Sequence, residues 1–114
     1  MKILIDTNVL VAGVLEVHPA HARVLPYLKK FQSKTDKALL CSHGLAEAYA
    51  ILTSLPLSPK VSPAEAKRVL EATSSWLDVV TLSKSDYDAA VARVADLSFT
   101  SGSIYDALHA QAAL

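Results

Sequence analysis

The chain has 114 residues, of which 52% are apolar and 19% charged, so it is long enough for one domain with a core and is neither disordered nor a coiled coil. Its 11 basic and 11 acidic residues balance, which excludes a general electrostatic attraction to nucleic acid or to an anionic membrane. A single cysteine, Cys41, excludes an internal disulfide, and there is neither a leader-like segment nor a run of apolar residues long enough to span a membrane. We therefore expect a soluble, cytoplasmic protein without membrane contact.

The chain begins with an aliphatic run, Ile3-Leu4-Ile5, which is followed by Asp6-Thr7-Asn8. An unbroken aliphatic run is typical of a short strand in a parallel sheet, buried on both faces. Ligands of open α/β sheets bind just beyond the carboxyl ends of the strands, which is where Asp6 lies. Taken alone, Asp6 is explained equally well as the N-cap of the following helix.

Helical and extended patterns alternate along the rest of the chain. We expect further strands at residues 38–41 and 77–82 and helices at residues 9–15, 20–31, 43–52, 62–74, 85–97 and 104–114. Pro26 predicts a kink in the second helix or its division into two pieces. The third helix is apolar nearly all round, so we expect it to be largely buried. Strands separated by helices predict βαβ units and an α/β fold with a parallel sheet.

Serine residues mark the expected starts of three helices. Ser42 is a candidate N-cap, and Ser62 and Ser85 stand three residues before Glu65 and Asp88, the spacing of a capping box.

One basic stretch, at residues 29–37, holds four lysines against one aspartate. Most such stretches are solvated ends of helices. Lys29, Lys30 and Lys34 are nevertheless the candidates for contact with a phosphate backbone.

Two more acids stand in apolar surroundings. Glu47 interrupts an apolar helix, and Asp106 lies early in the last helix. Each has a simple structural explanation, because Glu47 suits an exposed stripe and Asp106 pairs with Ser103 in a capping-box pattern. Together with Asp6, however, they suggest a site, since clustered carboxylates repel one another unless a cation neutralises them. Carboxylates are the preferred ligands of Mg²⁺ and Mn²⁺, which promote phosphodiester hydrolysis.

Three segments in the expected order resemble those that carry the acids of the PIN domain, a metal-dependent ribonuclease fold that includes the VapC-type toxins of toxin–antitoxin pairs. They are Asp6-Thr7-Asn8-Val9-Leu10, Ser42-His43-Gly44-Leu45-Ala46-Glu47-Ala48-Tyr49 and Ser103-Ile104-Tyr105-Asp106-Ala107-Leu108-His109-Ala110. The resemblance implies a three-layer α/β/α domain over residues 1–114.

The resemblance also implies the site and its partners. Asp6, Glu47 and Asp106 would be catalytic and would bind Mg²⁺ or Mn²⁺. Supporting roles would fall to three further side chains, those of Thr7, Asn8 and Ser103. RNA would be the substrate, a cognate antitoxin would be the protein partner, and the protein would be a homodimer.

The sequence departs from the family pattern at its end. A PIN domain continues past the last helix into a fourth strand and a fourth polar or acidic site residue, whereas this chain ends at Leu114. We therefore expect the last strand–helix portion to be missing and the first strand, central in the family, to lie at an edge. Because an apolar unpaired edge tends to recruit another chain, we expect homodimerisation or higher association there.

Two hypotheses about function follow. The first is a VapC-like metal-dependent endoribonuclease. The second is an inactive, shortened PIN module that acts in protein binding or dimerisation. A metal-dependent phosphatase with Asp6 as nucleophile is disfavoured, because Asn8 stands where that chemistry usually has a second acid.

Overall fold

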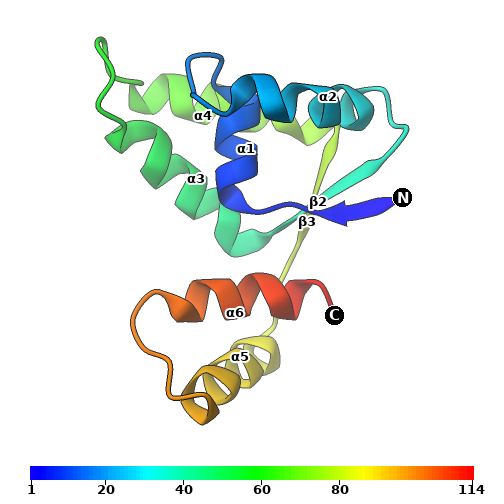
Figure 1. The fold of residues 1–114 in the computed structure, drawn as a ribbon, viewed down its shortest axis with the longest axis vertical. Helices are drawn as coiled ribbons and strands as arrows, with labels where there is room; N and C mark the ends of the chain where they lie inside the picture. Colours follow the sequence, from blue (N-terminus) through cyan, green and yellow to red (C-terminus); the bar gives the residue numbers. More distant parts are fainter.

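The computed structural model describes residues 1–114 and contains one sheet of three parallel strands (Figure 1). The strands are β1 (Lys2–Leu4), β2 (Lys37–Cys41) and β3 (Leu77–Val80), in the order β1-β2-β3. The register pairs Ile3 with Ala38 and Leu39 with Asp78. The predicted α/β class with a parallel sheet is confirmed.

Six α-helices and one short 3₁₀ turn connect and cover the strands. They are α1 (Thr7–Val14), α2 (His21–Gln32), α3 (Ser42–Ser54), α4 (Pro63–Ala72), the turn η1 (Thr73–Ser75), α5 (Lys84–Asp96) and α6 (Ser103–Ala112). None of these helices is long and apolar enough to cross a bilayer.

α2 is a single helix, so its predicted division at Pro26 is wrong. Proline removes the N–H that would bond the carbonyl four residues earlier, here that of Ala22. Both Pro26 and Ala22 are exposed, and water can therefore satisfy that carbonyl without breaking the helix.

The predicted cap of α4 is confirmed, because the Glu65 N–H donates to Ser62 Oγ at 3.1 Å. The predicted cap at Ser42 is wrong, since Ser42 is already helical and Cys41 stands at the N-cap. The position predicted for the α5 capping box is also wrong by two residues.

The capping box of α5 is formed by Ser83 and Asp86. The Asp86 N–H donates to Ser83 Oγ at 3.2 Å, and the Ser83 N–H donates to Asp86 Oδ2 at 2.9 Å. The sequence offers the same spacing at Ser85 and Asp88, and the earlier pair is used because β3 ends at Val80, before the predicted position.

The helices form two layers of unequal size on the two faces of the sheet (Figure 1). Successive strand residues point to opposite faces. Accordingly, Leu40 belongs to the larger core with residues of α1–α4, and Cys41 belongs to a smaller core with residues of α5 and α6. Phe31 and Trp76 stack in the larger core, with ring centroids 6.0 Å apart.

The expectation that α3 is largely buried is wrong. Only one stripe, Gly44, Ala48 and Leu52, is fully buried. Tyr49 is 41% exposed, because α1, α4 and β2 contact α3 without surrounding it.

β1 lies at an edge of the sheet, as expected, because its only neighbour is β2. The pairing extends one residue beyond the strand, where the Ile5 N–H donates to the Leu39 carbonyl at 2.8 Å. This pairing carries the chain to Asp6 at the carboxyl end of the sheet.

Candidate active site

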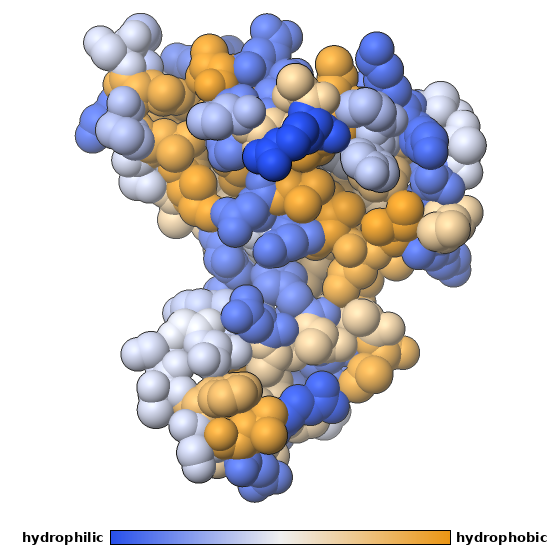
Figure 2. Space-filling view, in the orientation of Figure 1, coloured by the Kyte–Doolittle hydropathy of each residue, from blue (hydrophilic) through white to orange (hydrophobic).

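The three acids come from three elements that meet at the carboxyl end of the sheet. Asp6 follows β1, Glu47 lies in the second turn of α3, and Asp106 lies in the first turn of α6. The first turns of α1 and α3 lie close to α6 in Figure 1, and Figure 2 shows hydrophilic residues gathering at this narrow part of the molecule. The fold therefore brings residues more than 40 positions apart in the sequence to one region.

Asp6 occupies the N-cap position of α1, but its side chain makes no capping hydrogen bond. The backbone carbonyl of Asp6 accepts the first hydrogen bond of the helix, from the Leu10 N–H at 3.2 Å. The carboxylate is exposed and has no hydrogen-bond partner in the protein. The helix start therefore explains the position of Asp6 and leaves its carboxylate available to a ligand.

Asp106 is also exposed and unpaired, and its predicted capping box with Ser103 does not form. Gly102 is the N-cap of α6, and no side chain caps this helix. Asp6 and Asp106 instead line one cavity of about 360 Å³ together with Leu4, His109 and Ala110. We call this the carboxylate cavity.

Glu47 does not lie on an exposed stripe, because its half-buried carboxylate faces two histidines. The His109 Nε2–H donates to Glu47 Oε1 at 3.3 Å, and His43 Nε2 lies 3.0 Å from the same oxygen without the alignment of a hydrogen bond. A carboxylate only accepts, so His109 carries a proton on Nε2. His43 in turn stacks on Tyr105 of α6, with centroids 4.7 Å apart.

His109 links the three acids, because it contacts Glu47 and lines the carboxylate cavity with Asp6 and Asp106. As they stand, no three His, Cys, Asp or Glu side chains converge closely enough to hold a metal ion. The donor chemistry fits Mg²⁺ or Mn²⁺, since all three acids offer oxygen.

The three predicted supporting residues lie in different surroundings. Thr7 is buried, and its Oγ1 lies 3.5 Å from His109 Nε2. Asn8 is exposed on the first turn of α1. Ser103 lines a neighbouring cavity that also contains Asp106.

The structure does not bring the predicted phosphate-contacting lysines to the acids. Lys29 and Lys30 lie in the last turn of α2, and Lys34 follows in the turn that leads into β2. They therefore lie beside the amino end of a parallel sheet, whereas Asp6 follows the carboxyl end.

Sequence reasoning did not include in the predicted site four residues that surround the acids. His109 and His43 were detectable, because they stand three residues after Asp106 and four before Glu47, spacings that share a helix face. Arg93 and Phe99 line the neighbouring cavity with Asp106. No local spacing links these two residues to an acid, because the packing of α5 against α6 brings them there.

Fold and site together define an α/β/α domain with a carboxylate-lined site at the carboxyl edge of a parallel sheet. The family model of the PIN domain matches residues 3–114, and the chain belongs to this family.

Two relatives from Mycobacterium tuberculosis are similar over most of the chain. Ribonuclease VapC27 is 34% identical over 109 residues, which cover 96% of this chain and 74% of the relative. Ribonuclease VapC40 is 31% identical over 104 residues, which cover 90% and 72% of the two chains.

Proposed function

We propose that this protein is a VapC-like, metal-dependent endoribonuclease, the toxin of a toxin–antitoxin pair that acts in the cytoplasm. In this proposal Asp6, Glu47 and Asp106 hold Mg²⁺ or Mn²⁺ and catalyse hydrolysis of RNA phosphodiesters. The observation that carries the proposal is the carboxylate cavity, in which two acids far apart in sequence meet and to which His109 connects the third. Membership of the PIN family and two relatives named as ribonucleases support it.

The side chains have distinct roles in this proposal. The unpaired carboxylates of Asp6 and Asp106 would hold the ion, and Glu47 would do so in place of its hydrogen bond with His109. A bound divalent ion lowers the pKa of water and stabilises charge on a phosphate. His109 then retains Thr7 as a neighbour and keeps α6 against α1.

The remaining polar side chains would contact RNA. Asn8 and Ser103 border the acids, and their polar groups suit hydrogen bonds to the substrate near the scissile phosphate. Lys29, Lys30 and Lys34 would contact the backbone only where RNA extends across the sheet to its amino edge.

The unpaired edge of β1 is the proposed place for protein partners. Cavities lie on both sides of this strand: the carboxylate cavity and an apolar one of about 330 Å³ lined by Ile3, Val24 and Phe31 among others. A segment of an antitoxin or of a second copy would add hydrogen bonds along this edge and cover apolar surface. We propose a homodimer or higher association through this edge.

The second candidate function is that of an inactive PIN module for protein binding or dimerisation. Two observations favour it: the unpaired edge strand and the absence of three converging ligands.

Cleavage of a mixed tRNA and mRNA pool with Mn²⁺ or Mg²⁺ tests the first candidate. We expect the wild-type protein to cut RNA and both EDTA and Asp6→Asn to abolish cutting, because the mutation removes a proposed ligand. Asp88→Asn is the matched control, since Asp88 is an exposed acid on α5 paired only with Lys84. Circular dichroism shows whether each variant is folded.

Two outcomes would count against the nuclease. Folded wild-type protein that cuts no RNA would support the binding module. Activity that Asp6→Asn retains would indicate a contaminating nuclease. For the binding module, light scattering over a range of concentrations should then show self-association or capture of an added partner.

A further inference from the structure

A second cavity adjoins the carboxylate cavity on the far side of Asp106. It has a volume of about 260 Å³ and is lined by Arg93, Leu97 and Phe99 from α5 and the following loop, and by Ser103 and Asp106 from α6. We call it the Arg93–Phe99 cavity. Asp106 and Ala110, one turn apart on α6, line both cavities, so the two cavities are neighbours along this helix.

We propose that the Arg93–Phe99 cavity is a nucleotide subsite, in which Phe99 stacks on a base of single-stranded RNA and Arg93 binds a phosphate beside the scissile one. This inference rests on the proposed function and adds to it the contact that positions the substrate. The ligand is recognised by two chemical groups, a flat base and a phosphate anion.

Phe99 has the exposure that stacking requires. It is 57% exposed although it is a large apolar residue, so its ring is not explained by burial in a core. The backbone of Phe99 is anchored to α5, because the Phe99 N–H donates to the Val94 carbonyl at 3.0 Å. An exposed aromatic ring on an anchored backbone offers a face to a base of any sequence.

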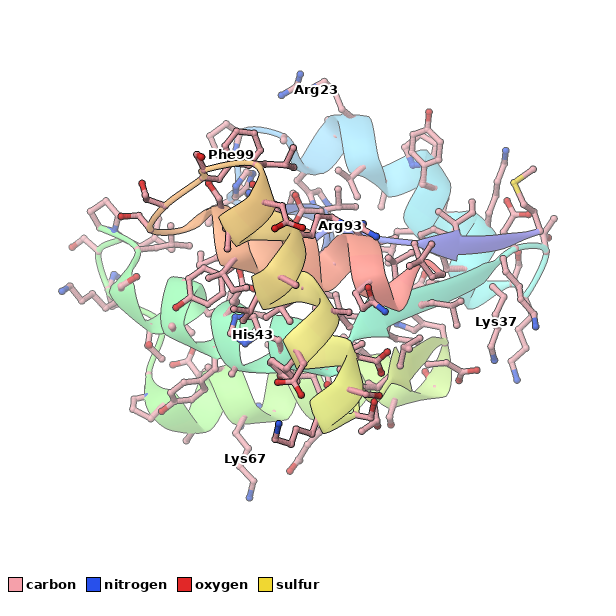
Figure 3. All side chains as sticks on the ribbon, turned by 90° about the horizontal axis from the view of Figure 1, so that it is seen from below. Arg23, Lys37, His43, Lys67, Arg93 and Phe99 are labelled. Carbon is pink, nitrogen blue, oxygen red and sulfur yellow. The ribbon has the colours of Figure 1, made fainter.

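Arg93 has the charge that a phosphate requires. It lies in the last turn of α5 and forms no ion pair or side-chain hydrogen bond, although Asp106 lines the same cavity. Its guanidinium therefore keeps all its donors free for a phosphate, which it can bind through two parallel hydrogen bonds. Figure 3 shows Arg93 on α5 and Phe99 at the loop that follows it, and both residues line the cavity beside α6.

The size and position of the cavity favour a single base. Its volume is below the range of about 300 to 1,000 Å³ that is typical of pockets for whole small molecules. A phosphodiester at Asp6 and Asp106 would place the next nucleotide along α6, toward Phe99. The Arg93–Phe99 cavity would therefore provide a substrate contact beside the acids, a region that the lysines of α2 do not reach.

Fluorescence anisotropy of a labelled single-stranded oligouridylate tests the proposal. EDTA prevents cleavage during the titration. We expect Phe99→Ala to weaken binding by about 5-fold or more, the loss expected for removing one stacked base, and Phe99→Trp to restore it. An abasic oligonucleotide of the same length should bind equally well to the wild-type protein and to Phe99→Ala, because it carries no base to stack.

The arginine has its own readout. Arg93→Gln should reduce the slope of log affinity against log salt concentration by about 0.7, the value for one phosphate contact on a single strand. Matched controls are Tyr87→Ala and Arg68→Gln, exposed residues that line neither of the two cavities. Both controls should bind as tightly as the wild-type protein.

Several results would overturn the subsite. The wild-type protein could bind no RNA, Phe99→Ala could bind RNA as tightly as the wild-type protein, or the two controls could lose as much affinity as Phe99→Ala and Arg93→Gln; each result would contradict the proposal. A change in self-association with Phe99→Ala, without a change in RNA binding, would assign the surface to a protein partner instead. Failure of the nuclease proposal can be distinguished from failure of the subsite. In the first case the protein would not cleave RNA but would still show the Phe99-dependent binding measured in EDTA.

Discussion

The carboxylate of Glu47 accepts a hydrogen bond from an imidazole, whereas those of Asp6 and Asp106 have no partner. At the level of single residues this difference separates one acid from the other two. In the proposed metal site, the two unpaired acids would need no change of partner to bind a cation. Glu47 would have to exchange His109 for the ion, so His109 would compete with the metal for this carboxylate.

Gly44 allows α3 to pack closely against Leu40 of β2. A Cβ added there would meet Leu40 Cδ1 at 2.8 Å and Cγ at 2.9 Å. Leu40 is fully buried in the larger core and cannot move aside easily. The glycine is therefore required by packing.

Gly44→Ala should destabilise the protein by about 1 to 3 kcal/mol, because overpacking outweighs the gain in helix propensity. Gly102→Ala is the control, since nothing lies within 4 Å of its added Cβ and its φ is −66°. Chemical denaturation measures both variants. A stabilised Gly44→Ala protein would mean that Leu40 relaxes at no cost.

At the level of elements, Asp86 joins the start of α5 to the end of α6. Its carboxylate accepts the Ser83 N–H at 2.9 Å and the Gln111 side-chain N–H at 3.2 Å. The backbone hydrogen bond from Ser83, then the bond from Gln111, lower the pKa of Asp86 below its ordinary value of 3.8. The ionised form is therefore the one that stabilises the fold.

Asp86→Asn should lower the melting temperature at neutral pH, and the difference from the wild-type protein should shrink in acid. A lowered pKa in the folded state means that the stabilisation is fully present above pH 3.8 and is lost as the pH falls through the lower folded value. Asp88→Asn, the control, should change the melting temperature little because Asp88 makes only an exposed pair with Lys84. Thermal melts from pH 7 down to the onset of acid unfolding measure this, and a larger effect of Asp88→Asn would assign the capping box to the later serine.

At the level of the whole molecule, the two helical layers have cores of different size. The larger core holds 12 buried residues, and the smaller one holds five: Cys41, Leu82, Ala90, Ala107 and Leu108. α5 and α6 pack mainly on each other, and α6 reaches the sheet at β2. We therefore expect this layer to be the less stable part of the fold.

Native-state hydrogen exchange should show that amides of α5 and α6 exchange faster than those of α3 and β2. Leu108→Ala should cost about 2 to 5 kcal/mol in the stability of this layer and accelerate exchange mainly there. Leu52→Ala in the larger core is the matched variant and should accelerate exchange throughout. Equal acceleration everywhere by both variants would show a single cooperative unit.

The acids of the site lie on both layers, because Asp6 and Glu47 belong to the larger layer and Asp106 to the smaller one. Binding of an ion or RNA between them would therefore stabilise the contact of the two layers. Occupancy of the proposed site would then increase the stability of α5 and α6.

The edge position of β1 followed from the family resemblance. The sequence by itself determined the strands, the parallel sheet and the acids proposed for the site. These features depend on local patterns: aliphatic runs, helical periodicity, and charges in apolar surroundings. The family resemblance, confirmed by the match over residues 3–114, placed the acids in order.

Tertiary structure alone decided which partners those residues meet. The sequence has the serine–aspartate spacing of a capping box at Ser83/Asp86 and at Ser85/Asp88. Only Ser83 and Asp86 form the box, because β3 ends early enough for α5 to begin after Ser83. Packing of α6 against α3 brought His109 to Glu47, and packing of α5 against α6 brought Arg93 and Phe99 to Asp106. Local periodicity predicts which residues lie on the same face of a helix. It does not predict which side chains of a neighbouring element contact that face, because these contacts join residues distant in the chain.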